Sequence, residues 1–208
     1  EAVREAGQLL GVGGDVLPVT LDNVRLSAEL EDGTLIRGET NIDIPRHDGR
    51  LKIKRVWLDP HARLNPRVRH ALGEADLIVI GPGDLYTSVI PNLIVRGMRD
   101  ALKKSKAKKV YIANIMTKWG ETHGFSAGDF LEMLERHTGK GIGDYALINT
   151  RVPSRDRLRH YEKESSQFVA AADLRARPVP IFGNFLRSRG FIRHDPDLLA
   201  RTLVSLLQ

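Results

Sequence analysis

Hydrophobic residues follow two different patterns along the chain. In residues 23–44 they alternate with polar residues, which is the period of a strand with one buried face. The Asp-Gly pair of EDGT at residues 31–34 is a hairpin signal, and residues 16–20 and 52–60 also have the character of strands. We therefore expect an antiparallel β-hairpin unit over about residues 16–58.

From residue 65 onward, short apolar runs alternate with segments of helical period. The run DLIVIG at residues 76–81 is continuous, which is typical of a strand buried on both faces of a sheet. Further strands are expected at residues 109–115, 144–150, 167–172 and 178–183. Helices are expected at residues 65–75, 88–106, 126–139, 153–165 and 195–208, with Asn65 and Asp195 as caps and Gly73 at the end of the first.

This alternation of strand and helix predicts an α/β fold with a mainly parallel sheet. We expect a single domain over residues 1–208 that carries the hairpin unit as an insertion. Residues 1–11 have the pattern of a helix already in progress, and no methionine starts the chain. We therefore expect that an amino-terminal part is missing.

Parallel sheets bind ligands beyond the carboxyl ends of their strands. Three segments leave expected strands in this way: GPGD at residues 81–84, NIMTKWGET at 114–122 and NTRVPS at 149–154. In the first, Gly81 and Gly83 permit a tight turn, and the helix that follows offers free N–H groups that suit a phosphate. This turn is the first candidate for a ligand site.

Asp84 complicates a phosphate site at this turn, because a bare carboxylate repels phosphate. It could hold a cation that bridges to the phosphate, or it could accept a hydrogen bond from a sugar hydroxyl. Thr87 and Ser88 add hydroxyl groups close by. The alternative is a turn without a ligand, in which Asp84 caps the helix.

The joint at residues 114–126 is long and polar, which favours a role in binding. Trp119 could stack on a ring or only cover the joint, and the alternative is a loop held by its own side chains. Arg193, just before the last helix, could pair with a phosphate through two N–H groups, whereas His194 alone is weak evidence. The side chains of the long joint that could face a ligand are Asn114, Thr117, Glu121, Thr122 and His123.

Composition excludes several classes of function. The net charge of +6 favours an anionic partner or a solvated basic surface, but the basic run at residues 103–109 contains no aromatic residue for base stacking, so nucleic acid is not favoured. The absence of cysteine agrees with a cytoplasmic protein, and no apolar run is long enough to span a membrane. G-x-S-x-G and H-E-x-x-H motifs are absent, which disfavours a serine hydrolase and a zinc enzyme.

Two of these segments carry a family resemblance. ADLIVIGPGDLYTSVIPNLIV together with NIMTKWGETHGFS resembles the YvcK family of gluconeogenesis or morphogenesis factors (UPF0052), within the CofD-like superfamily of 2-phospho-L-lactate transferases. The flanking segments VLPVT, EDGTLIRGETNI and RHDPDLLARTL are also similar, so that the resemblance spans residues 15–208. It implies a Rossmann-like three-layer α/β fold.

The resemblance implies two alternative functions. One is a regulatory protein that binds a UDP-sugar, notably UDP-N-acetylglucosamine, and is linked to carbon metabolism, cell-wall synthesis and cell shape in bacteria. The other is an enzyme that moves a phospholactyl group from a nucleotide diphosphate to a deazaflavin with Mg²⁺, for which Asp84 would hold the metal. The resemblance favours the regulator without catalysis. A module that binds only protein partners, and a homo-oligomer, stay open.

The resemblance also assigns ligand-binding residues. They are Gly81, Pro82, Gly83, Asp84, Tyr86, Thr87, Ser88, Asn114, Met116, Thr117, Tyr161 and Arg193. One family feature is not found here: a glycine-rich turn of the GGGTG type, which follows the first strand and serves the nucleotide. GVGGD at residues 11–15 is no substitute, because it follows a helix pattern and precedes a strand pattern.

Overall fold

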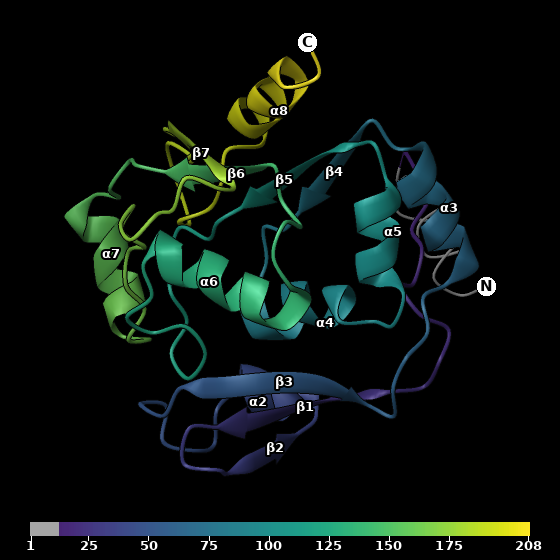
Figure 1. The fold of residues 1–208 in the computed structure, drawn as a ribbon. Coiled ribbons are helices and arrows are strands. Elements are labelled where there is room, and N and C mark those ends of the chain that lie inside the picture. The colour runs from purple at the N-terminus through teal and green to yellow at the C-terminus, as the bar shows by residue number, and fades with distance from the viewer. Residues whose placement is uncertain (1–12) are drawn as a thin grey trace.

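Two β-sheets organise the chain in the computed structural model, which describes residues 13–208 (Figure 1). One sheet is antiparallel with the strand order β2-β1-β3, and the other is parallel with the order β4-β5-β6-β7. The helix expected at residues 1–11 lies outside the described residues. None of the helices within residues 13–208 is both long and apolar enough to cross a membrane.

The antiparallel sheet confirms the predicted hairpin. Its strands are β1 (Arg25–Leu30), β2 (Leu35–Arg37) and β3 (Ile53–Asp59). At the turn between β1 and β2, the Asp32 carboxylate accepts hydrogen bonds from the N–H and the hydroxyl of Thr34, and Gly33 adopts a φ of 89°. The Asp-Gly pair therefore forms the hairpin turn that the sequence predicts.

Two strand predictions in the amino-terminal part are wrong. The return strand ends at Arg37, because Gly38 turns the chain with a φ of 91°, and the short helix α2 (Glu39–Asp43) follows and buries Ile42 completely. Residues 16–20 form no strand either, since the carbonyls of Pro18 and Val19 accept hydrogen bonds from the side chain and the N–H of Asn65. This segment is bound to the start of a helix instead of to a sheet.

The parallel sheet confirms the α/β class. Its strands are β4 (Leu77–Ile80), β5 (Lys108–Ile112), β6 (Tyr145–Asn149) and β7 (Val179–Gly183). The strand expected at residues 167–172 is wrong. That segment lies alongside the loop after β5 instead, with one antiparallel bridge between Met116 and Phe168. The strand that pairs with β6 is β7.

The helices and helical turns that follow α2 are α3 (Pro66–Glu74), the π-helical turn η1 (Leu85–Val89), α4 (Ile90–Leu93), α5 (Met98–Lys104), α6 (Ala127–Thr138), α7 (Arg155–Glu162) and α8 (Pro196–Ser205). The side chains of Asn65 and Asp195 cap α3 and α8 as predicted, but α3 continues through Gly73 to Glu74. The single helix expected at residues 88–106 is wrong, because Gly97 has a φ of 96° and the backbone of Arg96 bonds to Ala62 and Leu64.

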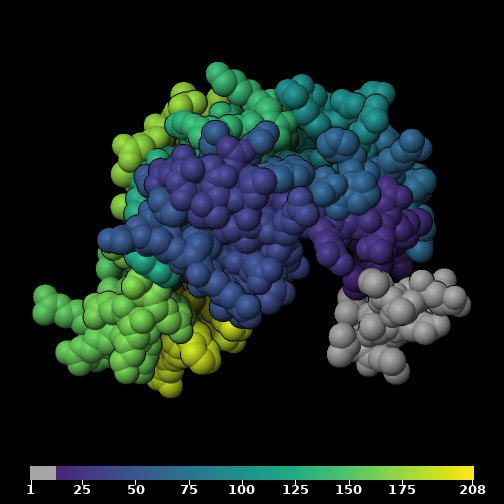
Figure 2. All heavy atoms as spheres, turned by 90° about the horizontal axis from the view of Figure 1, so that it is seen from below, coloured from purple at the N-terminus to yellow at the C-terminus, as the bar shows by residue number. Residues whose placement is uncertain are grey.

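Helices cover both faces of the parallel sheet, which gives the three predicted layers. Figure 1 shows α8 on one face and α4, α5 and α6 on the other, with the antiparallel sheet packed on the outer side of this helical layer. One hydrophobic core joins that sheet to the helices and the parallel sheet, for example through Ala28, Ile90 and Phe130. Viewed from the side of the antiparallel sheet, this sheet covers the middle of the molecule and the segment around α7 projects beside it (Figure 2).

Candidate functional site

A cavity of about 1110 Å³ opens beyond the carboxyl ends of β4 and β5. Five stretches of the chain form its wall: the end of α2, the turn after β4, the loop after β5, the end of α7 with the residues that follow, and the hairpin before α8. The segment NTRVPS after β6 is not part of the wall. There the side chain of Asn149 donates to the carbonyl of Arg151 and accepts from the N–H of Phe185, which forms a structural corner.

The turn after β4 depends on its two glycines. Gly81 has a φ of 79°, and a Cβ on it would lie 3.2 Å from the carbonyl oxygen of Ile112. A Cβ on Gly83 would lie 3.2 Å from the Cβ of Ser88. Gly83 lines the cavity together with Pro82 and Ser88, whereas Gly81 shapes the turn from behind.

The helix after this turn is not the one that the sequence predicts. Leu85–Val89 is a π-helical turn, in which the N–H groups of Ser88 and Val89 both bond to the carbonyl of Asp84, and α4 adds only four residues. A phosphate here would therefore not face the dipole of a long helix. The side chain of Asp84 does not cap the turn, so the alternative of a plain capping residue is wrong.

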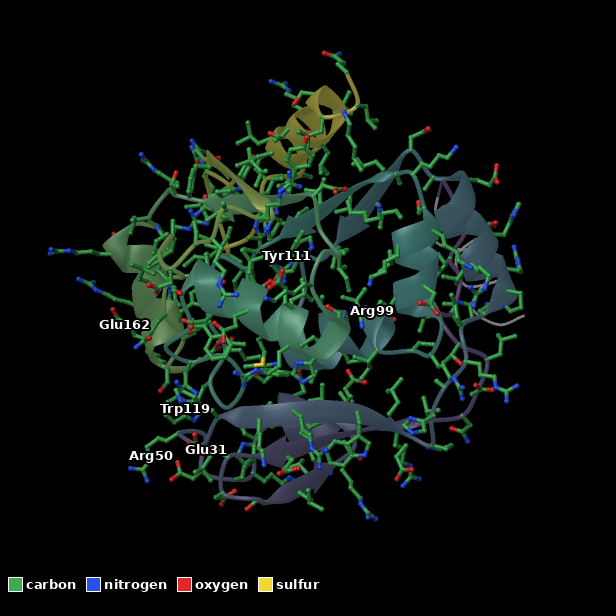
Figure 3. All side chains as sticks on the ribbon, viewed as in Figure 1. Glu31, Arg50, Arg99, Tyr111, Trp119 and Glu162 are labelled. Carbon is green, nitrogen blue, oxygen red and sulfur yellow. The ribbon has the colours of Figure 1, made fainter. Side chains whose placement is uncertain are left out.

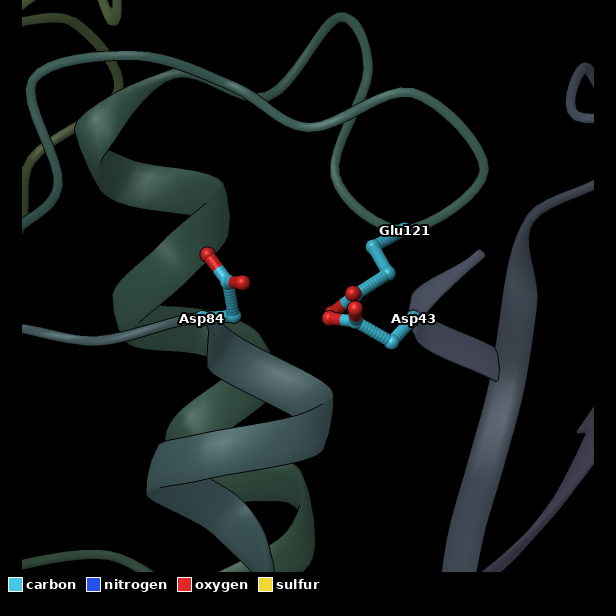
Figure 4. A group of neighbouring side chains, drawn as sticks. All are labelled: Asp43, Asp84 and Glu121. Carbon is cyan, nitrogen blue, oxygen red and sulfur yellow. The ribbon is translucent and has the colours of Figure 1, made fainter. Parts of the chain in front are cut away.

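The Asp84 carboxylate instead joins a cluster of charges at one end of the cavity. It lies 2.8 Å from the Nζ atom of Lys118, which also forms ion pairs with Asp43 and, at 3.1 Å, with Glu121. Figure 4 shows the three carboxylates turned toward one another from three different segments. We call Asp43, Asp84 and Glu121 the carboxylate cluster.

Glu121 is the buried member of the carboxylate cluster. Its side chain is 0% exposed, its Oε1 atom accepts a bond of 3.4 Å from the hydroxyl of Thr87, and its Oε2 atom has no hydrogen-bond partner within residues 13–208. Burial raises the pKa of Glu121 to about 7 against the opposing effect of the Lys118 ammonium. Burial disfavours the charge of Lys118, but hydrogen bonds to Asp43 and Asp84 outweigh this and raise its pKa above the usual value.

The loop after β5 holds its shape through its own hydrogen bonds. The backbone N–H of Thr117 donates to the carbonyl of Gln167, and its hydroxyl accepts from the N–H of Gln167. Asn114 and Met116 lie beside it on the cavity wall, and the Oδ1 atom of Asn114 is buried without a partner in the described part of the chain. Trp119 lines the cavity where the loop meets the antiparallel sheet unit (Figure 3).

The part of the wall formed by the end of α7 and the hairpin before α8 carries one acidic residue, Glu164, and one arginine, Arg193. Arg193 is exposed, its guanidinium lies 5.7 Å from the ring centre of Phe191, and it forms no ion pair within residues 13–208. Tyr161 is held in place because its hydroxyl accepts a bond of 2.9 Å from the N–H of Ile192. Burial lowers the pKa of His194, whose Nε2 atom is buried and unpartnered in the described residues. The charged residues of the wall therefore form two groups, the carboxylates around Lys118 and the pair Glu164 and Arg193.

Nine of the twelve residues expected from the sequence line this cavity. They are Pro82, Gly83, Asp84, Ser88, Asn114, Met116, Thr117, Tyr161 and Arg193. The structure places Tyr86 and Thr87 behind the wall: Tyr86 is 0% exposed and its hydroxyl donates to the carbonyl of Ile53, and Thr87 bonds to Glu121. Lys118 and Asp43 also line the cavity, but neither is among the site residues expected from the sequence. No sequence signal brings Asp43 to the loop, since 75 positions separate it from Lys118.

Comparisons with known proteins agree with this architecture. Residues 1–182 match the family model described as 2-phospho-L-lactate transferase CofD. The chain is 39% identical over 213 residues to the gluconeogenesis factor of Bacillus subtilis, covering 100% of this chain and 66% of the relative. A crystal structure of a UPF0052-family protein from Bacillus halodurans matches with a TM-score of 0.87 and 36% identity, covering 96% of this chain and 65% of that one.

The chain is shorter than these relatives. It spans about half the length of two curated relatives, 47% of one from Clostridium acetobutylicum and 52% of one from Thermotoga maritima, to which it is 39% and 47% identical. The match to the first of these includes 100% of this chain. The activities and ligands of the full-length relatives can therefore only be proposed for this chain.

Proposed function

Because the chain belongs to the CofD family and to its branch of gluconeogenesis factors, we propose that it is a regulatory protein that binds a nucleotide sugar of the UDP-N-acetylglucosamine type. The proposal includes the roles that the resemblance implies, in carbon metabolism, cell-wall synthesis and cell shape. It places the protein in the cytoplasm. The ligand site is the cavity beyond β4 and β5.

One observation supports the proposal above all: the size and the polarity of this cavity. Ligand pockets measure about 300–1,000 Å³, so that about 1110 Å³ leaves room for a base, a ribose, a diphosphate and a sugar. The wall carries few charged groups: Asp43, Asp84 and Lys118 belong to one cluster, and Arg193 and Glu164 come from the hairpin before α8 and the segment after α7. A ligand with an anionic part and a part rich in hydroxyls fits this division.

The division also suggests how such a ligand lies. The guanidinium of Arg193 is free to pair with a diphosphate through parallel N–H groups. The carboxylate cluster repels phosphate but accepts hydrogen bonds from hydroxyls, which suits a sugar. Asn114 also lines the cavity, and its side-chain amide can form hydrogen bonds with a uracil or with a sugar hydroxyl.

Titration calorimetry tests this proposal directly. UDP-N-acetylglucosamine should release or absorb heat with a single-site isotherm and should raise the Tm of the protein. UDP and N-acetylglucosamine, tested separately, should each bind more weakly than the intact nucleotide sugar. If millimolar UDP-N-acetylglucosamine produces neither heat nor a shift of Tm, the proposal is wrong.

The second candidate is a phospholactyl transferase, which the description of the matching family model favours. Oxygen ligands of the carboxylate cluster suit Mg²⁺ in type, and Asp84 is among them as expected. However, the ammonium of Lys118 already bonds to all three carboxylates, so this chain would have to release it before a metal could bind. Formation of a phospholactyl deazaflavin by the purified protein would favour the transferase over the regulator.

A further inference from the structure

The carboxylate cluster has the geometry of a cation site. One oxygen from each of Asp43, Asp84 and Glu121 can be chosen so that the three atoms lie within 4.8 Å of one another. Calcium binds oxygen at about 2.3–2.6 Å, so that two ligands on opposite sides of the ion are roughly 4.6–5.2 Å apart. Carboxylate oxygens are also the ligands that hard divalent cations prefer.

Glu121 gives independent evidence that a cation belongs here. An isolated carboxylate is seldom buried, because the loss of hydration disfavours its charge. The Glu121 side chain is nevertheless 0% exposed and points into the cluster, where its Oε2 atom lacks a partner among the described residues (Figure 4). A positive charge beside this carboxylate is the contact that offsets such burial.

The chain supplies that charge itself. The Lys118 ammonium donates hydrogen bonds to Asp43 and, at 2.8 Å, to Asp84, and it forms an ion pair with Glu121 at 3.1 Å. The loop holds Lys118 in position: its N–H donates to the hydroxyl of Thr122, and its carbonyl accepts from the N–H groups of Glu121 and Thr122. Lys118 therefore lies at the centre of the carboxylate cluster, where a metal ion would contact the same oxygen atoms.

We propose that Lys118 is a built-in cation, which occupies a three-carboxylate metal site and so closes it to divalent ions. The metal expected from the sequence at Asp84 then does not bind to this chain, and ligand binding in the cavity does not require one. The inference concerns the cavity of the proposed function but holds whichever ligand the cavity takes. It also predicts that the loss of one charge turns the cluster into a metal site.

Substitution of Lys118 by an uncharged residue of similar length tests this. Binding of Mn²⁺ is followed by the loss of its free electron paramagnetic resonance signal, and binding of Ca²⁺ and Mg²⁺ by the shift of Tm. Wild-type protein should bind Mn²⁺ weakly or not at all, and Lys118→Met should bind it roughly a hundredfold more tightly, since a repelling charge is replaced by open carboxylates. Lys118→Met combined with Asp84→Asn should lose most of this gain.

Lys54→Met is the matched control, because Lys54 pairs with the single carboxylate of Glu29 on the exposed side of the antiparallel sheet. It should gain no metal binding. If Lys118→Met does not fold, Lys118→Gln keeps an uncharged N–H donor group in the cluster and serves the same purpose.

Two results would overturn the inference. One is tight Mn²⁺ binding by the wild-type protein that Asp84→Asn abolishes, because Lys118 would then not close the site. The other is a folded Lys118→Met that binds Mn²⁺ no better than wild type. Neither measurement contains a nucleotide, so a failure here is distinct from a failure of the nucleotide-sugar titration.

Discussion

The imidazole of His137 accepts a hydrogen bond of 3.1 Å at its Nε2 atom from the backbone N–H of Val56. This contact joins α6 to β3 and thus the helical layer to the antiparallel sheet. The other ring nitrogen, Nδ1, lies 3.0 Å from the carbonyl of Met133, to which it donates. Only the neutral imidazole with its proton on Nδ1 satisfies both bonds.

We predict that this contact makes stability depend on pH. Burial lowers the pKa of His137, and the charge of Arg136 acts in the same direction, so the folded state takes up a proton less readily than the unfolded state. The contribution of neutral His137 to the free energy of unfolding is therefore fully present above the unfolded pKa of about 6.5. It decreases as the pH falls below that value. Urea unfolding at pH 7.5 and 5.5 measures this loss.

His137→Gln should lower the free energy of unfolding at pH 7.5 by about 1–2 kcal/mol and should reduce its dependence on pH. His70→Gln, at an exposed position of α3, is the control and should change neither quantity. Some pH dependence should remain in both variants, because burial also lowers the pKa of His194. An unaltered pH dependence in His137→Gln would show that the contact does not have this role.

Arg193→Ala should weaken the binding of UDP-N-acetylglucosamine by about ten- to a hundredfold, the usual effect of losing a charge-assisted hydrogen bond. Arg193→Lys should recover only part of the affinity, since an ammonium cannot form two parallel bonds to a diphosphate. Arg189→Ala, an exposed arginine of the same hairpin that does not line the cavity, should bind like wild type. Equal affinities for Arg193→Ala and Arg189→Ala would remove Arg193 from the site.

Asp84 and Lys118 should be energetically coupled. The pair is about a third exposed, so we expect Asp84→Ala alone to cost at most about 1 kcal/mol, with Asp43 and Glu121 still holding the ammonium. Lys118→Ala should cost more, because it leaves Glu121 buried without its counter-ion. In a double-mutant cycle by urea unfolding, the two losses should not add, and strict additivity would contradict the coupling.

Gly81→Ala should cost more stability than the same change at Gly141. Both residues have a positive φ, of 79° and 80°, so both substitutions strain the backbone. A Cβ on Gly81 also lies 3.2 Å from the carbonyl oxygen of Ile112, whereas a Cβ on Gly141 meets no atom within 4 Å. We expect about 1–2 kcal/mol at Gly141 and a larger loss at Gly81, measured by thermal unfolding. Equal losses would mean that the turn after β4 relaxes freely.

Local patterns were enough to predict the parallel sheet and much of the cavity wall. The continuous apolar run of β4 and the glycine turn after it are local features, and the carboxyl ends of neighbouring parallel strands meet wherever such a sheet forms. For this reason the sequence alone predicts that the turn after β4 and the loop after β5 lie at the same edge of the sheet.

What could not be predicted depends on backbone geometry and distant contacts. The π-helical turn after Asp84 directs Tyr86 and Thr87 into the core, and no sequence pattern distinguishes such a turn from an α-helix. The positive φ of Gly38 ends the expected strand and α2 follows, with Asp43 at its end in contact with Lys118. Glycine was visible in the sequence at that position, but its φ was not.

The position of Trp119 has a practical consequence. The indole of Trp119 packs closely on Gly49, in the segment between α2 and β3: a Cβ added to Gly49 would lie 2.2 Å from the Nε1 atom of Trp119. Trp119 also lines the cavity, next to Lys118. The second tryptophan of the chain, Trp57, lies on the antiparallel sheet and is not part of the cavity wall. In a Trp57→Phe background, the fluorescence of Trp119 is thus an optical probe built into the protein, whose emission senses both the filling of the cavity and any separation of the loop from the antiparallel sheet unit.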